Sequence, residues 1–241
     1  MIWIVFDETV GFNKKETEPW EKIINDMGYI SKIMPYEVTL EEEYKNLFGI
    51  ISFSGNCSFD KQTEQGIPVV TINSLNKYPA ICENFTSLYF LADKIIEDAG
   101  YKKVVCFNFT NEDIFEVSKN KIYYGINSFF KTKYDLKTFS VNLKKEEIFS
   151  AVNDFFFEFS ENYDLFVFLN DTMFLAFEKE LKEKYKDKKI MVFSNHLRKK
   201  NLCVIGFDFD EKIKKAMEYL ISLYKVEFLS NPVYIQEPIV F

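Results

Sequence analysis

Short apolar runs alternate along the chain with longer segments in which apolar residues recur every three or four positions. The clearest pair lies within residues 164–185. Five consecutive apolar residues, Leu165 to Leu169, are too few for a helix and rich in Val and Phe, which favours a strand buried on both faces. From Met173 to Leu181 the apolar residues follow helical spacing, with charged residues between them. This stretch therefore predicts a strand that passes directly into a helix.

Asn170 and Asp171 occupy the junction between that strand and that helix. In open α/β sheets, ligands bind outside the carboxyl ends of the strands, so a carboxylate at this place can contact a ligand. An aspartate that precedes a helix can equally be its N-cap, which contributes roughly 1 kcal/mol. From the local sequence both interpretations of Asp171 are open, and an N-cap role does not exclude ligand contact by the second carboxylate oxygen.

The same alternation predicts an α/β protein throughout. Helical signals include a helix after Pro19 that Gly28 closes, and a helix capped by Thr86 that Gly100 ends. Strands joined by helices indicate parallel sheet covered by helices on both faces, with right-handed crossovers. The expected strands are 2–6, 29–34, 49–53, 69–72, 80–82, 103–107, 138–141, 165–169, 190–193 and 202–205, and further helices are expected at 40–47, 122–130, 148–159 and 212–224.

Composition and charge narrow the function classes. The 241 residues can form one large domain or two small ones, and a hydrophobic share of 47% with 27 phenylalanines excludes a disordered chain. The net charge of −7 and the single arginine, Arg198, argue against nucleic-acid binding by this chain itself, because phosphate contacts need clustered basic residues. No apolar stretch approaches the roughly 20 residues of a membrane span, and the amino terminus lacks a basic region. The sequence predicts a cytoplasmic protein with no membrane association.

Cysteine and histidine usage gives no catalytic or metal site. Four cysteines are scattered without a CxxC pair, and Cys106 and Cys203 lie within apolar runs, which indicates buried free thiols. His196 is the only histidine and no GxSxG motif accompanies it, so neither a zinc site nor a Ser-His-Asp triad is predicted. We therefore expect a protein that is not an enzyme and that uses no metal and no cofactor.

Several longer motifs are similar to those of one known family. They are GIPVVTIN at 66–73, ENFTSLYFLADKIIEDAGYKKVVCF at 83–107, and the Asn170-Asp171 pair that opens a methionine-containing helix. In this order, and over essentially the whole chain, they resemble the effector-binding core of the lactose-repressor/galactose-repressor (LacI/GalR) family. The resemblance implies α/β architecture with two Rossmann-like lobes built on parallel sheets, the periplasmic-binding-protein type I fold.

The resemblance also implies the boundaries of the lobes and the side chains in a ligand cleft between them. The N-terminal lobe would comprise 1–101 plus 206–227, and the C-terminal lobe 102–205 plus 228–241. Polar side chains at strand ends, with aromatic rings stacked on the ligand, would hold a small polyhydroxylated molecule, sugar-like or nucleoside-like. The implied ligand-binding residues are Asp7, Phe12, Asn56, Asn73, Asn84, Asp171 and Asn195, with Phe53 and Trp20 as further stacking candidates. Core packing is the alternative role for Trp20 and Phe12, and turn formation for Asn84.

The chain departs from the family pattern in three respects. Asn195 replaces the aspartate of the family's Gly-Phe-Asp-Asp strand end, and the similar GFDFD at 206–210 aligns instead with a later strand that crosses between the lobes. Ile122 occupies the position of the arginine that usually forks to sugar hydroxyls. The chain also starts at the first core strand, so DNA contact would require a helix-turn-helix that this chain lacks. The expected assembly is a homodimer.

Three functions from different classes follow from these features. The first is the effector-binding core of a transcriptional regulator, whose lobes close on a sugar-like or nucleoside-like ligand. The second is a vestigial dimerising core, or a solute-binding protein without a DNA-binding role, which the changes at Ile122 and Asn195 favour. The third is an enzyme or phospho-acceptor that uses Asp7 and Asp171, which a bound Mg²⁺ near both would support. We take the first as the working hypothesis.

Overall fold

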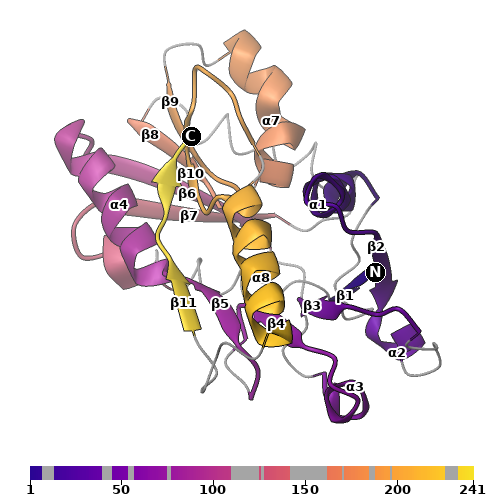
Figure 1. The fold of residues 1–241 in the computed structure, drawn as a ribbon. Helices are drawn as coiled ribbons and strands as arrows, with labels where there is room; N and C mark the ends of the chain where they lie inside the picture. The colour runs from indigo at the N-terminus through magenta and orange to yellow at the C-terminus, as the bar shows by residue number, and fades with distance from the viewer. Residues whose placement is uncertain are drawn as a thin grey trace. The chain divides into compact units, whose positions relative to one another are not determined.

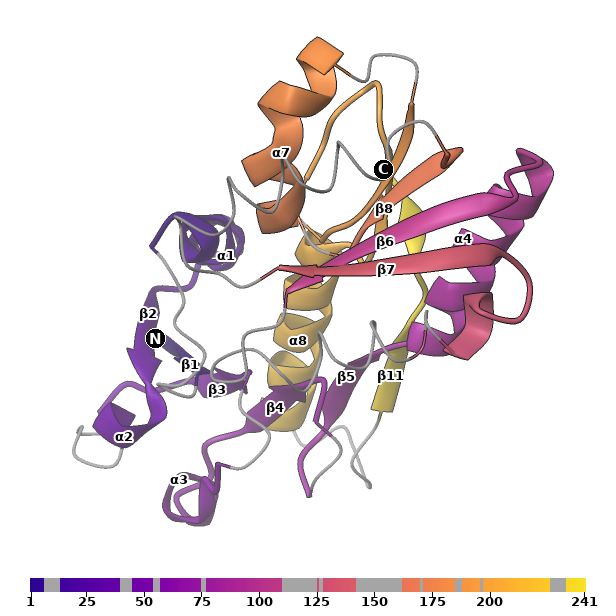
Figure 2. The ribbon, with the colours of Figure 1, turned by 180° about the vertical axis from the view of Figure 1, so that it is seen from behind.

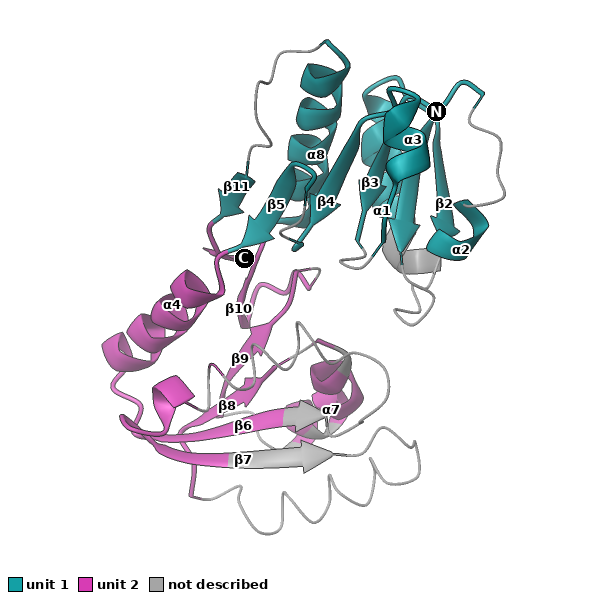
Figure 3. Ribbon diagram, turned by 90° about the horizontal axis from the view of Figure 1, so that it is seen from below, with its two compact units in different colours: residues 1–83, 208–236 teal, residues 84–207, 237–241 magenta. Residues whose placement is uncertain are grey.

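The computed structural model shows two compact units, which Figure 3 colours separately. Unit 1 comprises Met1–Glu83 and Asp208–Gln236, and unit 2 comprises Asn84–Phe207 and Glu237–Phe241. The chain therefore passes from one unit to the other three times. The structure describes residues 1–6, 14–39, 45–53, 57–74, 77–109, 125, 128–141, 162–169, 171–184, 188–195, 197–225 and 233–241.

Unit 1 is built on a six-stranded sheet in the order β11-β5-β4-β3-β1-β2, in which every neighbouring pair is parallel (Figure 1). Its strands are β1 (Ile2–Phe6), β2 (Ser31–Pro35), β3 (Gly49–Ser52), β4 (Val69–Ile72), β5 (Ala80–Glu83) and β11 (Val233–Gln236). Its helices are α1 (Lys14–Asp26), α2 (Tyr36–Thr39), α3 (Asp60–Glu64) and α8 (Phe209–Tyr224).

The sheet of unit 1 is buried on both faces. In β1, Ile2 and Ile4 point into a core shared with α1 and α8, while Trp3 and Val5 point into a second core that includes Phe59. A strand that is apolar at every position suits such two-sided burial, because successive side chains point to opposite faces. The continuous apolar runs in the sequence are explained by this arrangement.

Unit 2 repeats the plan with a second six-stranded sheet in the order β12-β10-β9-β8-β6-β7. Its neighbouring strands β8, β6 and β7 are labelled in Figure 2. Its pairs are parallel except for the short edge strand β12, which runs antiparallel to β10. Its strands are β6 (Lys103–Phe109), β7 (Asp135–Val141), β8 (Leu165–Phe168), β9 (Lys189–Phe193), β10 (Cys203–Gly206) and β12 (Ile239–Val240). The helices of unit 2 whose first and last residues the structure describes are α4 (Phe85–Asp98) and α7 (Asp171–Lys184).

Two helices cover opposite faces of the unit 2 sheet. Leu88, Ala92 and Ile96 of α4 belong to one core, and Met173 and Phe177 of α7 belong to the other. The predicted strand and helix within 164–185 are therefore β8 and α7, and they lie side by side in the fold. The predicted fold class, two α/β lobes on largely parallel sheets, is confirmed.

The GFDFD segment at 206–210 closes β10 and opens α8. Asp208 is the N-cap of α8, and its Oδ1 accepts hydrogen bonds from the backbone N–H of Asp210 at 2.9 Å and of Glu211 at 3.3 Å. The segment thus belongs to a crossing between the units, as the chain order predicted. Its first aspartate stabilises a helix end, which is the ordinary role of Asp at this position.

Two local predictions differ from the structure. The predicted cap at Thr86 is wrong, since Asn84 is the N-cap of α4 and its Oδ1 accepts from Ser87 N–H at 3.1 Å. The first helix begins at Lys14 and contains Pro19, although the apolar periodicity starts only at Trp20. Residues 14–18 are all polar, so hydrophobic spacing could not locate the beginning of this helix.

The first and last unit boundaries fall elsewhere than the expected 101 and 227, whereas the middle one, between Phe207 and Asp208, lies close to the expected 206. The first lies after Glu83, because the buried face of α4 packs on the sheet of unit 2. The last lies after Gln236, because β11 pairs with β5 in the sheet of unit 1. Long-range packing thus decides to which unit a helix or an edge strand belongs.

Some predictions fall outside the described residues, namely the helix at 148–159, most of the helix at 122–130 and most of the helix at 40–47. All four cysteines are free. The predicted burial is confirmed for Cys106, whose complete burial raises the pKa of its thiol, whereas Cys203 is only partly buried. Within the described ranges, no helix has the length and apolar character needed to cross a membrane.

Candidate functional site

Parallel strands end at one edge of a sheet, and this carboxyl edge is where such sheets bind ligands. In unit 1, Asn73 and Glu83 lie at the ends of β4 and β5. In unit 2, Asp171 and Asn195 follow β8 and β9. The predicted residues Asp7, Phe12 and Asn56, and also Ile122 and His196, lie outside the described residues.

Asn73 joins the ends of two neighbouring strands in unit 1. Its backbone has a positive φ of 56°, a conformation that Asn adopts more readily than most residues. Its Oδ1 accepts from the backbone N–H of Glu83, and its Nδ2 donates to Glu83 Oε2, both at 2.9 Å. Both polar atoms of the Asn73 amide therefore serve the carboxyl edge itself.

The other carboxylate oxygen of Glu83 forms an ion pair with Lys212 of α8. The side chains of Lys212 and Glu83 are only 2% and 6% exposed, so both charges are shielded from water. The ammonium group also lies 5.2 Å from the centre of the Phe209 ring, a favourable cation–π distance. Asn73, Glu83 and Lys212 thus form one connected polar cluster at the carboxyl edge of unit 1.

The sequence reasoning missed Glu83 and Lys212, although Lys212 left a signal. In the helical pattern of α8 it shares the buried face with Phe209, Ala216 and Leu220. A lysine on an apolar helix face is seldom buried without a partner. The partner itself could not be read from the sequence, because Glu83 lies 129 positions away.

Three aromatic rings pack together beside this cluster. The Trp20 ring lies 4.7 Å from both Phe53 and Phe209, with interplanar angles of 17° and 16°. Trp20 is only 1% exposed, so it is a core residue and offers little ring surface to a ligand. Phe53, at the end of β3, is partly exposed and remains a predicted stacking residue.

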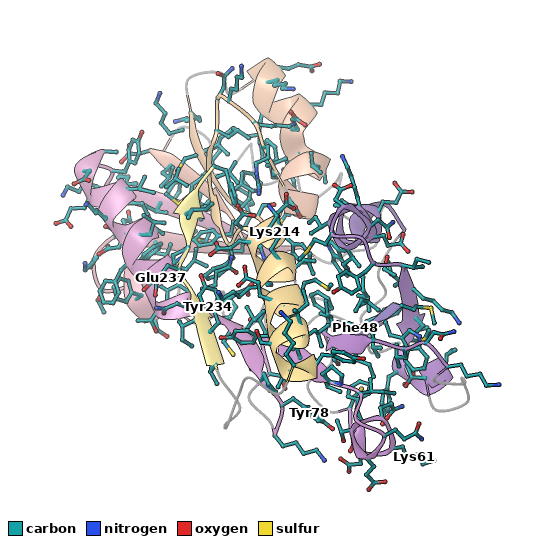
Figure 4. All side chains as sticks on the ribbon, in the orientation of Figure 1. Phe48, Lys61, Tyr78, Lys214, Tyr234 and Glu237 are labelled. Carbon is teal, nitrogen blue, oxygen red and sulfur yellow. The ribbon has the colours of Figure 1, made fainter. Side chains whose placement is uncertain are left out.

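A second set of hydrogen bonds in unit 1 fixes β11 to the start of α8. Gln236 is fully buried, and its Nε2 donates to the carbonyl oxygen of Asp208 at 2.7 Å and to Glu211 Oε2 at 3.2 Å. Tyr234, labelled in Figure 4, donates its hydroxyl to Glu211 Oε1 at 2.6 Å. This hydrogen bond, together with partial burial, raises the pKa of Tyr234 to about 12. Asp208 and Gln236 are the unit 1 residues directly beside two of the three chain crossings, and these contacts join them to each other.

In unit 2, Asp171 is the first residue of α7 and bonds to the neighbouring strand end. The Ser194 hydroxyl donates to Asp171 Oδ2 at 2.7 Å and accepts from the backbone N–H of Leu197 at 2.9 Å. Asp171 is partly exposed, and no described residue donates to its Oδ1. Asp171 therefore has one oxygen bound to Ser194 and a second oxygen that a ligand could use. The sequence prediction missed Ser194, although it is the polar residue directly after β9.

Asn195 follows Ser194 and joins β9 to the end of β10. Its Oδ1 accepts from the backbone N–H of Phe207 at 2.7 Å. The two strand ends come so close that a Cβ on Gly206 would lie 2.2 Å from the carbonyl oxygen of Ser194. Only glycine fits at Gly206, and Asn195 satisfies the backbone group that follows it.

Asn84 caps α4 and also binds the last crossing of the chain. Its Nδ2 donates to Glu237 Oε1 at 2.7 Å, and Glu237 is labelled in Figure 4. Hydrogen bonds from Ser87 and Asn84 lower the pKa of the Glu237 carboxyl. The turn-forming alternative for Asn84 therefore has direct structural support, while ligand contact by it stays a prediction.

The described edges offer donors and acceptors but no metal centre. Within the residues that the structure describes, no group of three or more His, Cys, Asp or Glu side chains could hold a metal ion. Carboxylate, amide and hydroxyl groups at strand ends are suited to hydrogen bonding with a polyhydroxylated ligand. Binding by hydrogen bonds is the chemistry that this set of residues supports.

No family model and no curated protein matches the sequence, but solved structures match along its whole length. The trehalose repressor from Escherichia coli has a TM-score of 0.77 at 12% identity, over 100% of this chain and 99% of that chain. A LacI-family transcriptional regulator from Enterococcus faecium with bound ribose has a TM-score of 0.73 at 14% identity, over 100% and 97%.

A third similar structure is a periplasmic binding protein/LacI transcriptional regulator from Alkaliphilus metalliredigens in complex with D-xylulofuranose. Its TM-score is 0.70 at 17% identity, over 100% of this chain and 97% of that chain. Because these sequence identities are low, the similarity establishes the fold alone. The chain has the α/β fold of LacI-family regulators and periplasmic binding proteins, as its motifs predicted.

Proposed function

We propose that this protein is the effector-binding core of a transcriptional regulator and that its ligand is a sugar-like or nucleoside-like molecule. The observation that carries the proposal is the arrangement of Asp171, Ser194 and Asn195 at adjoining strand ends of unit 2. The similar solved structures that contain ribose, lactose or D-xylulofuranose support a carbohydrate ligand.

The chemistry at Asp171 suits this class of ligand. A carboxylate oxygen accepts hydrogen bonds from sugar hydroxyls, and charge-assisted bonds of this kind are roughly twice as strong as neutral ones. Oδ2 is held by Ser194, which fixes the orientation of the carboxylate and leaves Oδ1 for the ligand.

The proposed mode of action is a shift in conformational equilibrium. A ligand that binds one conformation of the protein more tightly would favour that conformation, and an attached or partner DNA-binding head would respond to it. We further propose a cytoplasmic homodimer that binds a ligand without transforming it.

Isothermal titration against a panel of pentoses, hexoses, disaccharides and nucleosides tests the proposal. We expect at least one compound to bind, and Asp171→Asn to weaken it about tenfold through loss of a charge-assisted hydrogen bond. Asp98→Asn, at the exposed end of α4, is the matched control and should leave binding unchanged. Absence of binding by every compound, or equal affinity of the two variants, would contradict the proposal.

The second candidate function is a dimerising core without a ligand. Internal bonding favours it, since both amide atoms of Asn73 bind Glu83, and the side-chain Oδ1 of Asn195 accepts from the Phe207 N–H. Under this alternative the panel gives no binding while the oligomeric state, measured by light scattering, is a stable dimer. Ligand binding that depends on Asp171 excludes it.

A further inference from the structure

A cavity of about 670 Å³ lies in unit 2, away from the carboxyl edge. Leu165, Lys189 and Cys203 line it, and they are the first residues of β8, β9 and β10. Because these strands are parallel, the cavity lies at the edge opposite to Asp171 and Ser194. Its volume is within the range of roughly 300–1,000 Å³ that is usual for small-molecule sites.

The inner wall of the cavity is apolar. Leu165, Leu181 and Met191 are almost completely buried, and they come from β8, α7 and β9. Phe174 and Leu202 continue this wall along α7 and along the segment before β10. A ligand in the cavity would therefore bury an apolar body, which is favoured by roughly 25 cal/mol for each Å² removed from water.

The remaining wall is strongly basic, although the chain as a whole has a net charge of −7. Among the lining residues that the structure describes, Glu178 is the only carboxylate. It binds Lys182 at 2.7 Å and also binds Lys199, and these hydrogen bonds lower the pKa of Glu178. The lining lysines are Lys182, Lys188, Lys189, Lys199 and Lys200.

Lys189 and Lys200 carry charges that no neighbour in the described ranges neutralises. Lys188 donates to the carbonyl oxygen of Tyr163 at 3.0 Å, which orients its ammonium group. Lys189 and Lys200 form no ion pair or hydrogen bond with a described residue, and both are exposed. They add exposed positive charge to the basic wall of the cavity, beside its apolar inner wall.

We propose that this cavity is a second ligand site, which binds an amphiphilic anion consisting of a carboxylate or phosphate on an apolar chain or ring. The apolar wall takes the body of the ligand, and Lys189 and Lys200 bind its charged head. The site is separate from the carboxyl edge and does not depend on the proposed carbohydrate function. It gives the protein a second chemical input from a different class of molecule.

Titration calorimetry with decanoate, decyl phosphate and decanol tests this site. We expect both anions to bind and the double variant Lys189→Gln/Lys200→Gln to weaken them about tenfold, while decanol changes by less than about twofold. The double variant Lys94→Gln/Lys214→Gln removes the same charge from exposed helix positions and should bind like the wild type. The relative affinities of the two anions show which head group the lysines prefer.

Methyl NMR of the methionines locates the binding. Met191 lines the cavity, whereas Met217 lies in the core of unit 1. We expect decanoate to shift the Met191 methyl signal and to leave the Met217 methyl signal in place. The Lys189→Gln/Lys200→Gln variant should retain its affinity for carbohydrate. Absence of binding by both anions, equal binding by both double variants, or no change at Met191 would overturn the proposal.

Discussion

At the carboxyl edge of unit 1, Lys212 and Glu83 form an ion pair that is almost completely buried. At the carboxyl edge of unit 2, by contrast, Asp171 is partly exposed and its carboxylate accepts a hydrogen bond from the Ser194 hydroxyl. A buried pair is held in place by the cost of leaving either charge without its partner. An exposed carboxylate can exchange water for a ligand hydroxyl at little cost. The comparison suggests that the first edge maintains the fold, while the second is better suited to recognise a ligand.

The most severe test of this contrast is Lys212→Met. The substitution keeps an apolar stem in the core but leaves the Glu83 carboxylate buried and unpaired, so we expect stability to fall by about 3–5 kcal/mol. Urea denaturation measures the loss. Lys214→Met, two positions away and exposed, should change stability by less than about 0.5 kcal/mol.

A second substitution separates charge from packing in this experiment. In the Lys212→Met background, Glu83→Gln removes the unpaired charge and keeps an acceptor for Asn73, so part of the lost stability should return. If the two substitutions are simply additive, the buried pair does not explain the effect of Lys212→Met.

Asn195→Ala tests the structural part of the unit 2 edge. It removes the acceptor of the Phe207 N–H, and we expect a loss of about 1–3 kcal/mol. Asn195→Asp keeps an acceptor oxygen and should cost less. Hydrogen exchange at the Phe207 amide gives a direct measurement, since its protection should fall in the alanine variant and persist in the aspartate variant. Unchanged protection in both variants would show that the Asn195 bond is not formed in solution.

Asn84→Ala should have a smaller effect, because it removes the cap of α4 at about 1 kcal/mol. It also removes one of the hydrogen bonds that lower the pKa of Glu237, so that pKa should move up toward its ordinary value. A carboxyl whose pKa is lowered on folding contributes stability above its unfolded pKa, and this contribution is lost as the pH falls through the folded pKa. Acid denaturation of wild type and variant measures the difference, which should shrink at the lowest pH to the contribution of the cap alone.

The sequence was sufficient for the features that local patterns control. Five apolar residues followed by helical spacing located β8 and α7, and the carboxylate at their junction lies at a strand end as predicted. Motif order along the chain also predicted the fold that the solved structures share. Ligand contact by Asn73, Asn84, Asp171 and Asn195 is still a prediction.

Contacts between distant parts of the chain were beyond local patterns. Glu83 and Lys212 are adjacent only because β5 and α8 pack in one unit, and nothing near either residue in the sequence specifies the other. The assignment of α4 to unit 2 likewise depends on which sheet receives Leu88 and Ile96. Residue pairing of this kind is fixed by tertiary packing, which overrides local propensity.

Tyr234→Phe gives the smallest expected effect and tests whether the unit 1 edge is rigid beyond its buried ion pair. The Tyr234 hydroxyl binds Glu211, and the pKa of Tyr234 is raised from 10.0 to about 12. A phenol whose pKa is raised on folding stabilises the fold fully below its unfolded pKa and loses this contribution as the pH rises through the folded value. Because the tyrosine is partly exposed, we expect at most about 0.5 kcal/mol, present at neutral pH and lost between pH 10 and 12. Denaturation across this pH range should show a steeper decline for the wild type than for Tyr234→Phe, while Tyr224→Phe, exposed at the end of α8, should follow the wild type. Parallel curves for Tyr234→Phe and the wild type would mean that the Tyr234–Glu211 bond does not hold β11 against α8. The connection between β11 and α8 would then depend on other contacts, such as those of Gln236.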